Sequence, residues 1–201
     1  MLTVGNDAAG VERLLADGSF SCPGCGGRLA RWGFARERVF FGPCRRAETL
    51  RPRRSRCVSC LVTHVLLPAR LLARRADEAV VIGAALAAAA AGGGYRAAAT
   101  QLGVPADTVR GWVRRATGRA GQVRAAFTRA AGALSPDPVP LEPAGSPLAD
   151  ALVAVAATAV AAASRWPQLL AVSPWQVAAA VTDGSLLLPV MTARPLNTSS
   201  L

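Results

Sequence analysis

Four cysteines in two pairs are the residues of this sequence best suited to a defined chemistry. Cys22 and Cys25 form one pair and Cys57 and Cys60 the other, with 31 residues between the pairs. A two-residue spacer lets both sulfurs of a pair reach the same ion, and four thiolates form a closed tetrahedral shell around Zn²⁺. Such a shell leaves no position open for a substrate, so the spacing predicts one structural zinc ion.

The chain between the two pairs must fold back for the sulfurs to meet. Its length exceeds the roughly 15 to 20 residues of the commonest zinc pattern. Strands over 29–34 and 39–41 around a charged turn are expected to form a hairpin, followed by an extended piece over 49–56 and a closing strand over 63–67. Gly26 can take the positive φ that turns the backbone under the first pair of sulfurs, whereas Leu61 stands at that place after the second pair. This pattern predicts a zinc ribbon.

Free thiols and disulfides are the alternatives to a zinc site. Five cysteines is an odd number, and the acidic N-terminal segment lacks the basic-then-apolar character of a signal peptide, so disulfides are disfavoured. Cys44, in a Gly-Pro-Cys turn, and His64, the single histidine, could each replace a ligand. A packed or surface role is the interpretation favoured for both.

Positive charge is concentrated in two stretches. All 23 basic residues are arginines, and 12 residues are acidic. Residues 28–75 contain 13 arginines and two glutamates, and residues 96–129 contain seven arginines and one aspartate. A solvated surface normally mixes both signs, so these stretches favour a polyanionic partner. The alternative explanation for the many arginines is the base composition of a GC-rich coding sequence.

Helical periodicity begins after Pro68 and predicts helices over 77–91, 95–102, 105–117 and 118–132, besides a short helix over 9–17 near the N-terminus. Asp77 is expected to be the N-cap or a first-turn residue of the first of the four. The 95–102 and 105–117 pair matches a helix-turn-helix, because Gly103 permits the left-handed turn and Val109 and Trp112 fall on the inward face. A plain helical hairpin is the alternative.

In a helix-turn-helix, the outward residues of the second helix of the motif enter the major groove of DNA. These predicted contacts are Ala106, Asp107, Thr108, Arg110, Gly111, Arg114 and Arg115. Arg110 and Arg114 lie one turn apart, so one can present its fork to guanine while the other contacts phosphate. Further phosphate contacts are expected from the ribbon arginines Arg53, Arg54 and Arg56.

The C-terminal third differs from the rest of the chain. Residues 133–147 are rich in proline and predict a linker, residues 148–191 an alanine-rich helical region, and residues 192–201 a disordered tail. The apolar run over 148–163 is shorter than the roughly 20 strongly apolar residues of a membrane span, so a packed helix is expected. These helices are the predicted contact of a homodimer.

Several motifs resemble those of an uncharacterised actinobacterial family. They are Cys-Pro-Gly-Cys-Gly-Gly at 22–27, Leu-Arg-Pro-Arg-Arg-Ser-Arg-Cys-Val-Ser-Cys at 50–60, Val-Thr-His-Val-Leu-Leu-Pro at 62–68, and the segments 95–105 and 108–115. Members of that family join a zinc ribbon to a helix-turn-helix and look like the DNA-binding head of insertion-sequence transposases. The resemblance covers roughly residues 10–130 and implies zinc and DNA as ligands.

The sequence therefore predicts a mainly α fold with a small β zinc ribbon, divided into an N-terminal helix (1–19), a ribbon (20–68), a helix-turn-helix domain (69–132) and the C-terminal regions given above. The expected function is sequence-specific binding of double-stranded DNA, as a transcriptional regulator or a transposase-like recognition module, in the cytoplasm with the nucleoid. No membrane and no small-molecule substrate are expected.

No enzymatic activity is expected either, because transposition needs three carboxylates around two Mg²⁺ ions. Only four acidic residues follow residue 130, and two of them lie in the linker. The alternatives are a protein-interaction adaptor and a non-catalytic remnant or accessory subunit of a transposase.

Overall fold

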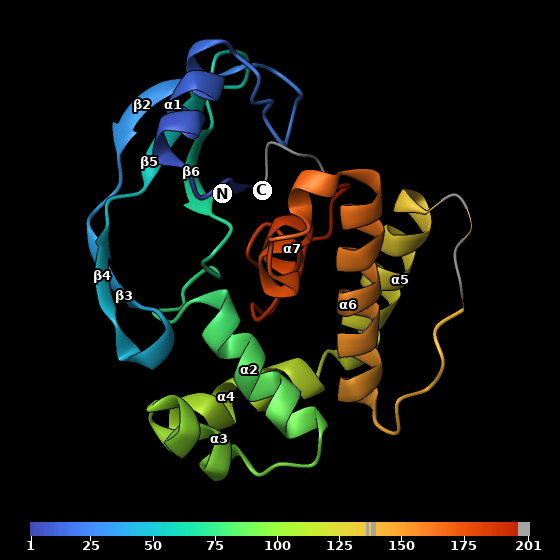
Figure 1. The fold of residues 1–201 in the computed structure, drawn as a ribbon. Coiled ribbons are helices and arrows are strands. Elements are labelled where there is room, and N and C mark those ends of the chain that lie inside the picture. The colour runs from blue at the N-terminus through green and yellow to red at the C-terminus, as the bar shows by residue number, and fades with distance from the viewer. Residues whose placement is uncertain (136, 138–139, 197–201) are drawn as a thin grey trace.

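The chain is mainly helical and carries a small β part beside its helices (Figure 1), as the sequence predicts. The computed structural model describes residues 1–135, 137 and 140–196. In the ribbon view the strands and the first helix lie on one side, helices α5 and α6 lie on the other, and α7 lies between them.

Four strands form one mixed sheet and two form a separate hairpin. The sheet has the order β1-β6-β5-β2, in which β1 is parallel to β6 and the other neighbours are antiparallel. Its strands are β1 (Leu2–Val4), β2 (Leu29–Phe34), β5 (Arg53–Cys57) and β6 (Thr63–Pro68). The hairpin joins β3 (Arg38–Phe41) to β4 (Ala47–Leu50) through the short 3₁₀ helix η1 (Pro43–Arg45).

The predicted pairing of residues 29–34 with 39–41 is wrong. Strand β2 pairs instead with β5, and this register places Leu29 opposite Cys57, so that the two cysteine loops meet at the same end of the sheet. The extended piece expected over 49–56 is broken at Arg51 and Pro52 into two strands that belong to different sheets. Proline has no N–H to continue a ladder, which explains the break.

One face of the four-stranded sheet is buried and the other is open to solvent. Helix α1 (Ala8–Ala16) begins at Asp7, whose side chain accepts the N–H groups of Ala9 and Gly10, and it packs against the buried face. The small core between them is made of Val4, Val11, Leu15, Phe20, Cys22, Leu29, Cys57 and Leu66. Because side chains alternate along a strand, Arg54 and Arg56 lie on the open face.

The predicted helices are present, with ends shifted by a few residues. They are α2 (Ala79–Ala90), α3 (Tyr95–Leu102), α4 (Ala106–Thr117), α5 (Ala120–Leu134), α6 (Pro147–Arg165) and α7 (Pro174–Val181). The expectation that Asp77 is the N-cap or a first-turn residue of α2 is wrong, because Asp77 precedes the N-cap. Glu78 is the N-cap residue and makes no side-chain cap bond, while the buried Asp77 carboxylate pairs with Arg45 of η1 and ties the hairpin to the start of α2.

Helices α2 to α7 share one hydrophobic core. Helices α5 and α6 pack along each other, and the buried Thr158 hydroxyl donates to the Phe127 carbonyl at 2.8 Å between them. Helix α7 packs against α2, where the backbone of Gly83 lies directly on the indole of Trp175. The Thr3 N–H donates to the Asp183 carboxylate at 3.1 Å, so β1 is joined to the end of α7.

Two predicted regions fall partly outside the described residues. Residues 136 and 138–139 belong to the proline-rich linker, and residues 197–201 to the predicted disordered tail. In the described part of the tail, Arg194 pairs with Asp183 at 2.8 Å and Leu196 is buried.

Candidate metal centre and nucleic-acid interface

The two cysteine pairs sit in loops with matching backbone bonds. In the first loop the Gly26 N–H donates to the Cys22 carbonyl at 2.9 Å, and in the second the Leu61 N–H donates to the Cys57 carbonyl at 3.1 Å. Gly26 has φ +73° and Leu61 has φ +62°. Leu61 thus takes the left-handed conformation that a turn glycine would adopt more easily, at a cost of about 1–2 kcal/mol.

Substitutions at these two turn positions are expected to change the stability of the protein in opposite directions. Leu61 is exposed, so Leu61→Gly loses little packing and is expected to stabilise the metal-loaded protein by about 1 kcal/mol. The matched change Gly26→Leu is expected to destabilise it by about 1–2 kcal/mol. Denaturant unfolding at a fixed metal concentration measures the free energy of unfolding of both variants. Destabilisation by both variants would contradict a left-handed Leu61.

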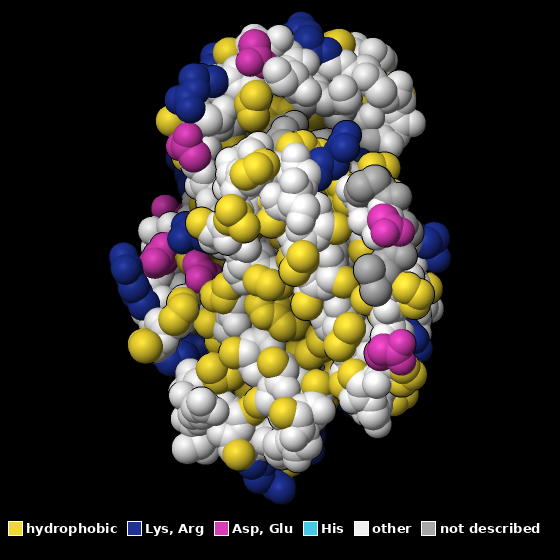
Figure 2. All heavy atoms as spheres, turned by 45° about the vertical axis from the view of Figure 1, so that its right-hand side comes forward, with side chains coloured by type: hydrophobic (Ala, Val, Ile, Leu, Met, Phe, Trp, Pro, Cys, Tyr) yellow, Lys and Arg dark blue, Asp and Glu magenta, His cyan; other side chains and the backbone are white. Residues whose placement is uncertain are grey.

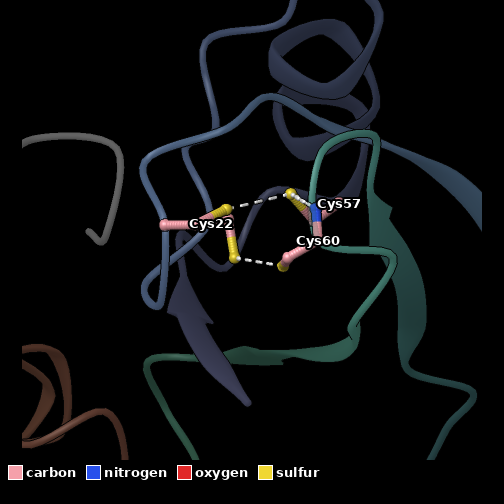
Figure 3. Close-up of side chains that lie close together, drawn as sticks. Cys22, Cys57 and Cys60 are labelled. Atoms are coloured by element: carbon pink, nitrogen blue, oxygen red, sulfur yellow. Dashed lines mark hydrogen bonds between the residues drawn. The ribbon is translucent and has the colours of Figure 1, made fainter.

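The four sulfur atoms face one another across the two loops (Figure 3) and all lie within 4.8 Å of one another. Two of these separations are 3.4 Å between Cys25 and Cys57 and 3.7 Å between Cys22 and Cys60. Bonds of 2.3 Å from a tetrahedral zinc ion to four sulfurs imply sulfur separations of about 3.8 Å. The cluster therefore has the donor set and the spacing of a metal site.

Electrostatics at the cluster favours thiolates balanced by a cation. The N–H of Cys60, then that of Ser59, donates to Cys57 Sγ and lowers the pKa of Cys57 to about 6. The Val62 N–H lowers the pKa of Cys60, but the adjacent sulfurs, Cys25 first, and burial together raise it to about 12. Four adjacent sulfurs thus oppose joint ionisation, and a bound cation removes that opposition.

The two residues considered as alternative ligands lie outside the four-sulfur cluster. His64 is buried on β6, with Nε2 at 3.5 Å from Cys22 Sγ. Burial lowers the pKa of His64, the positive chain N-terminus and Arg194 lower it further, and Asp183 opposes them. The neutral ring is thereby favoured, and in the tautomer protonated at Nε2 it can donate to the sulfur. Cys44 is exposed in η1.

The turn between α3 and α4 has the geometry expected from the sequence. Gly103 is left-handed with φ +65°, and the Val104 N–H returns to the Ala99 carbonyl at 3.0 Å. Val109 and Trp112 are buried against α2 and α3, which fixes how α4 is rotated about its axis. The opposite face of α4 is left for other contacts.

The predicted contact residues of α4 divide into two sets. Asp107, Arg110 and Arg114 are exposed, whereas Ala106, Thr108, Gly111 and Arg115 are half-buried. Arg110 pairs with Asp107 at 3.1 Å, in an exposed pair that contributes little to stability. Six of these seven residues line an open groove beside α4, the exception being Ala106.

The three ribbon arginines also differ in their surroundings. The Arg53 side chain is only 14% exposed and pairs with Glu12 of α1 at 2.6 Å. Glu12 also pairs with Arg31 at 3.0 Å, so the charge of Arg53 is partly compensated within the protein. Arg54 and Arg56 have no carboxylate partner in the described part of the chain. The Arg56 guanidinium lies 4.5 Å from the ring centroid of Trp32, which is half exposed.

Sequence analysis did not single out the opposite wall of the groove beside α4. That wall includes Arg74 and Arg75, which precede α2, and Arg45 of η1. The Arg-Arg pair at 74–75 ends the first basic stretch, so its charge is visible in the sequence. Its position beside α4 depends on the packing of the hairpin, which the sequence pattern does not give.

The C-terminal helices expose an apolar surface. Figure 2, which brings this side of the molecule forward, shows apolar side chains gathered over it and charged ones mostly toward its edges. Val160 of α6 is 67% exposed and Val153 is 36% exposed. Since nothing in the structure shows what covers them, the homodimer stays a prediction.

By length and composition α6 is the one helix of the described residues that could cross a membrane, with a mean hydropathy of 1.7. Its buried residues recur at the three- and four-residue spacing of a helix packed by one face, at Leu148, Ala151, Ala154, Val155, Thr158 and Ala162. A core helix of this kind passes the same length and composition test.

No known protein family, curated protein or solved structure matches this chain, so its function must be argued from its own residues and geometry.

Proposed function

We propose that this chain is a zinc-stabilised protein that binds double-stranded DNA in a sequence-specific manner, with α3 and α4 acting as a helix-turn-helix. The supporting observation is the division of α4 into two faces. Val109 and Trp112 anchor one face, and Arg110 and Arg114 extend from the other, one turn apart and exposed. Arginine forks at this spacing suit guanine edges and phosphates.

The metal in this proposal is zinc, held by Cys22, Cys25, Cys57 and Cys60. Four thiolates at tetrahedral spacing suit zinc or an iron site. The ion closes the end of the sheet that carries the two loops and leaves no position for a substrate, so its role is structural. Elemental analysis of purified protein should find one zinc per chain and no iron.

The ribbon is proposed to contact DNA through the open face of its sheet. Arg54 and Arg56 present uncompensated charge there, and Arg56 stacks on Trp32. Arg53 is assigned to holding α1 on the sheet, because its largely buried side chain pairs with Glu12 of α1. The protein is then a regulator or a transposase-like recognition module without catalysis of its own, located with the nucleoid.

Substituting the exposed arginines of α4 tests the proposal. Arg110→Ala and Arg114→Ala are each expected to weaken binding to a selected duplex, and loss of a base contact should cost about 1–3 kcal/mol and relax the preference at one position. The target is first selected from random duplex DNA, and dissociation constants are then measured at one salt concentration. Arg165→Ala is the matched control, because it removes one positive charge from an exposed position at the end of α6.

Two results would count against the proposal. If both variants bind like the parent, α4 is not the element that reads DNA. If affinity for duplex DNA responds little to salt, the protein-interaction adaptor gains support, because each phosphate contact contributes about −0.9 to the slope of log affinity against log salt.

A further inference from the structure

A groove of about 560 Å³ runs along one flank of α4. Helix α4 forms one wall, and the segment before α2 together with η1 forms the other. Its lining includes six arginines, which are Arg45, Arg74, Arg75, Arg110, Arg114 and Arg115. The groove therefore lies at the junction between the β part and the helix proposed to read DNA.

The carboxylates of this groove are already engaged. Asp77 pairs with Arg45, and Asp107 pairs with Arg110. The other four lining arginines have no ion pair to any described residue. The groove thus carries about four uncompensated positive charges, which an anionic ligand would neutralise.

Part of this charge is held in place by the fold. Arg75 donates from Nη2 to the Leu187 carbonyl at 2.9 Å and from Nη1 to the Arg74 carbonyl at 3.1 Å. Burial lowers the pKa of Arg75, and the nearby charges of Arg115, Arg119 and Arg74 lower it further. The Nε of Arg75 and the Nη1 of Arg119 are buried without a hydrogen-bond partner in the described structure. Fixed and mutually repelling guanidinium groups are an arrangement suited to phosphate.

The position of the groove identifies the source of that phosphate. The major groove of DNA is about 12 Å wide, and a helix with its side chains is about 10–12 Å across. A recognition helix therefore fills the major groove, and the two sugar-phosphate strands must run along its flanks. The arginine groove lies along one such flank of α4.

We infer that this groove binds backbone phosphates of one DNA strand, through Arg74, Arg75, Arg114 and Arg115. The inference rests on the proposed function and extends it. The β part then helps to hold the duplex against α4, because η1 and the segment after β6 form the second wall of the groove.

The test uses conservative variants of two arginines from opposite walls. Arg74→Gln and Arg115→Gln keep the aliphatic stem and a polar end group and remove the charge, and neither arginine makes an ion pair among the described residues. Arg75 is left intact because it supports the Leu187 carbonyl. Arg115, which the sequence places among the base contacts, is half-buried on the wall of this groove and is here reassigned to the backbone. Each variant is therefore expected to reduce the slope of log affinity against log salt by about 0.9 without changing base preference. Arg165→Gln is the control and should leave both properties unchanged.

The outcomes separate this inference from the function on which it rests. If the parent protein binds duplex DNA and both variants keep its full salt dependence, the groove does not bind the backbone, although the proposed function stands. If the parent does not bind duplex DNA at all, the proposed function fails and the inference fails with it. Circular dichroism establishes that the variants are folded.

A free polyphosphate is the competing source of the same chemistry. Calorimetry with pyrophosphate and with ATP tests it on the parent and on the two variants. Binding to the parent that both variants lose, combined with an unchanged salt dependence on DNA, would assign the groove to a free anion and overturn the inference. Reduced salt dependence in both variants supports the backbone.

Discussion

Removing the proposed zinc ion with a tight chelator is expected to unfold residues 20–68 while leaving helices α2 to α7 folded. The core under the sheet has only eight buried apolar residues, and two of them, Cys22 and Cys57, are proposed ligands. A structural zinc site contributes roughly 10–16 kcal/mol of apparent binding free energy, which so small a core cannot replace. The helices have a separate core of 30 buried residues.

Hydrogen exchange with mass spectrometry measures this effect by segment. Peptides from 20–68 should lose protection when one zinc per chain is released, and peptides from α5 and α6 should keep it. Cys22→Ser is expected to have the same effect as the chelator, whereas Cys44→Ser, at an exposed cysteine outside the cluster, should bind zinc normally. Retained protection of 20–68 in metal-free protein would show that zinc does not hold this part together.

Loss of zinc should also weaken DNA binding under the proposed function. The second wall of the arginine groove includes Arg45, whose position depends on the β3–β4 hairpin and on its pairing with Asp77. An unfolded β part leaves α4 in place and removes part of that wall. The expected result is reduced affinity with little change in base preference, because α4 carries the base contacts.

Local chemistry explains what the sequence could predict. The cysteine spacing identified the four sulfurs that the structure brings together, because a two-residue spacer constrains both sulfurs of a pair. Leu61 was recognised as occupying a glycine position, and it has a positive φ. The helices after Pro68 follow from apolar periodicity and from glycines such as Gly103, which act within a few residues of each other.

The errors concern contacts between residues far apart in the chain. Short strands such as 29–34 carry no local signal that chooses β5 over β3 as a partner, and the observed pairing with β5 brings the two cysteine loops together. Strand β1 was missed because three residues gain stability only from a parallel neighbour 64 positions later. The salt bridge of Arg53 to Glu12 likewise depends on where α1 packs.

Gly83→Leu is expected to destabilise the helical part by at least about 3 kcal/mol, since overpacking of a filled core costs 1–3 kcal/mol and this site is unusually tight. A Cβ atom at Gly83 would lie 2.0 Å from the indole of Trp175, so α7 must move away from α2. Glycine is roughly 0.8–1 kcal/mol less favourable in a helix than alanine, and leucine ranks just below alanine, so helix propensity alone would predict the opposite result.

Gly121→Leu is the matched control for this effect, because a Cβ at Gly121 in α5 meets no atom within 4 Å. It should leave stability unchanged or raise it slightly. Trp175→Ala combined with Gly83→Leu should recover part of the loss, since removing the indole makes room, and the coupling in this double-mutant cycle measures the contact between α2 and α7. Additive effects of the two substitutions would mean that α7 does not pack on Gly83. In that case α7 would not belong to the core that α2 shares with the helices proposed to bind DNA.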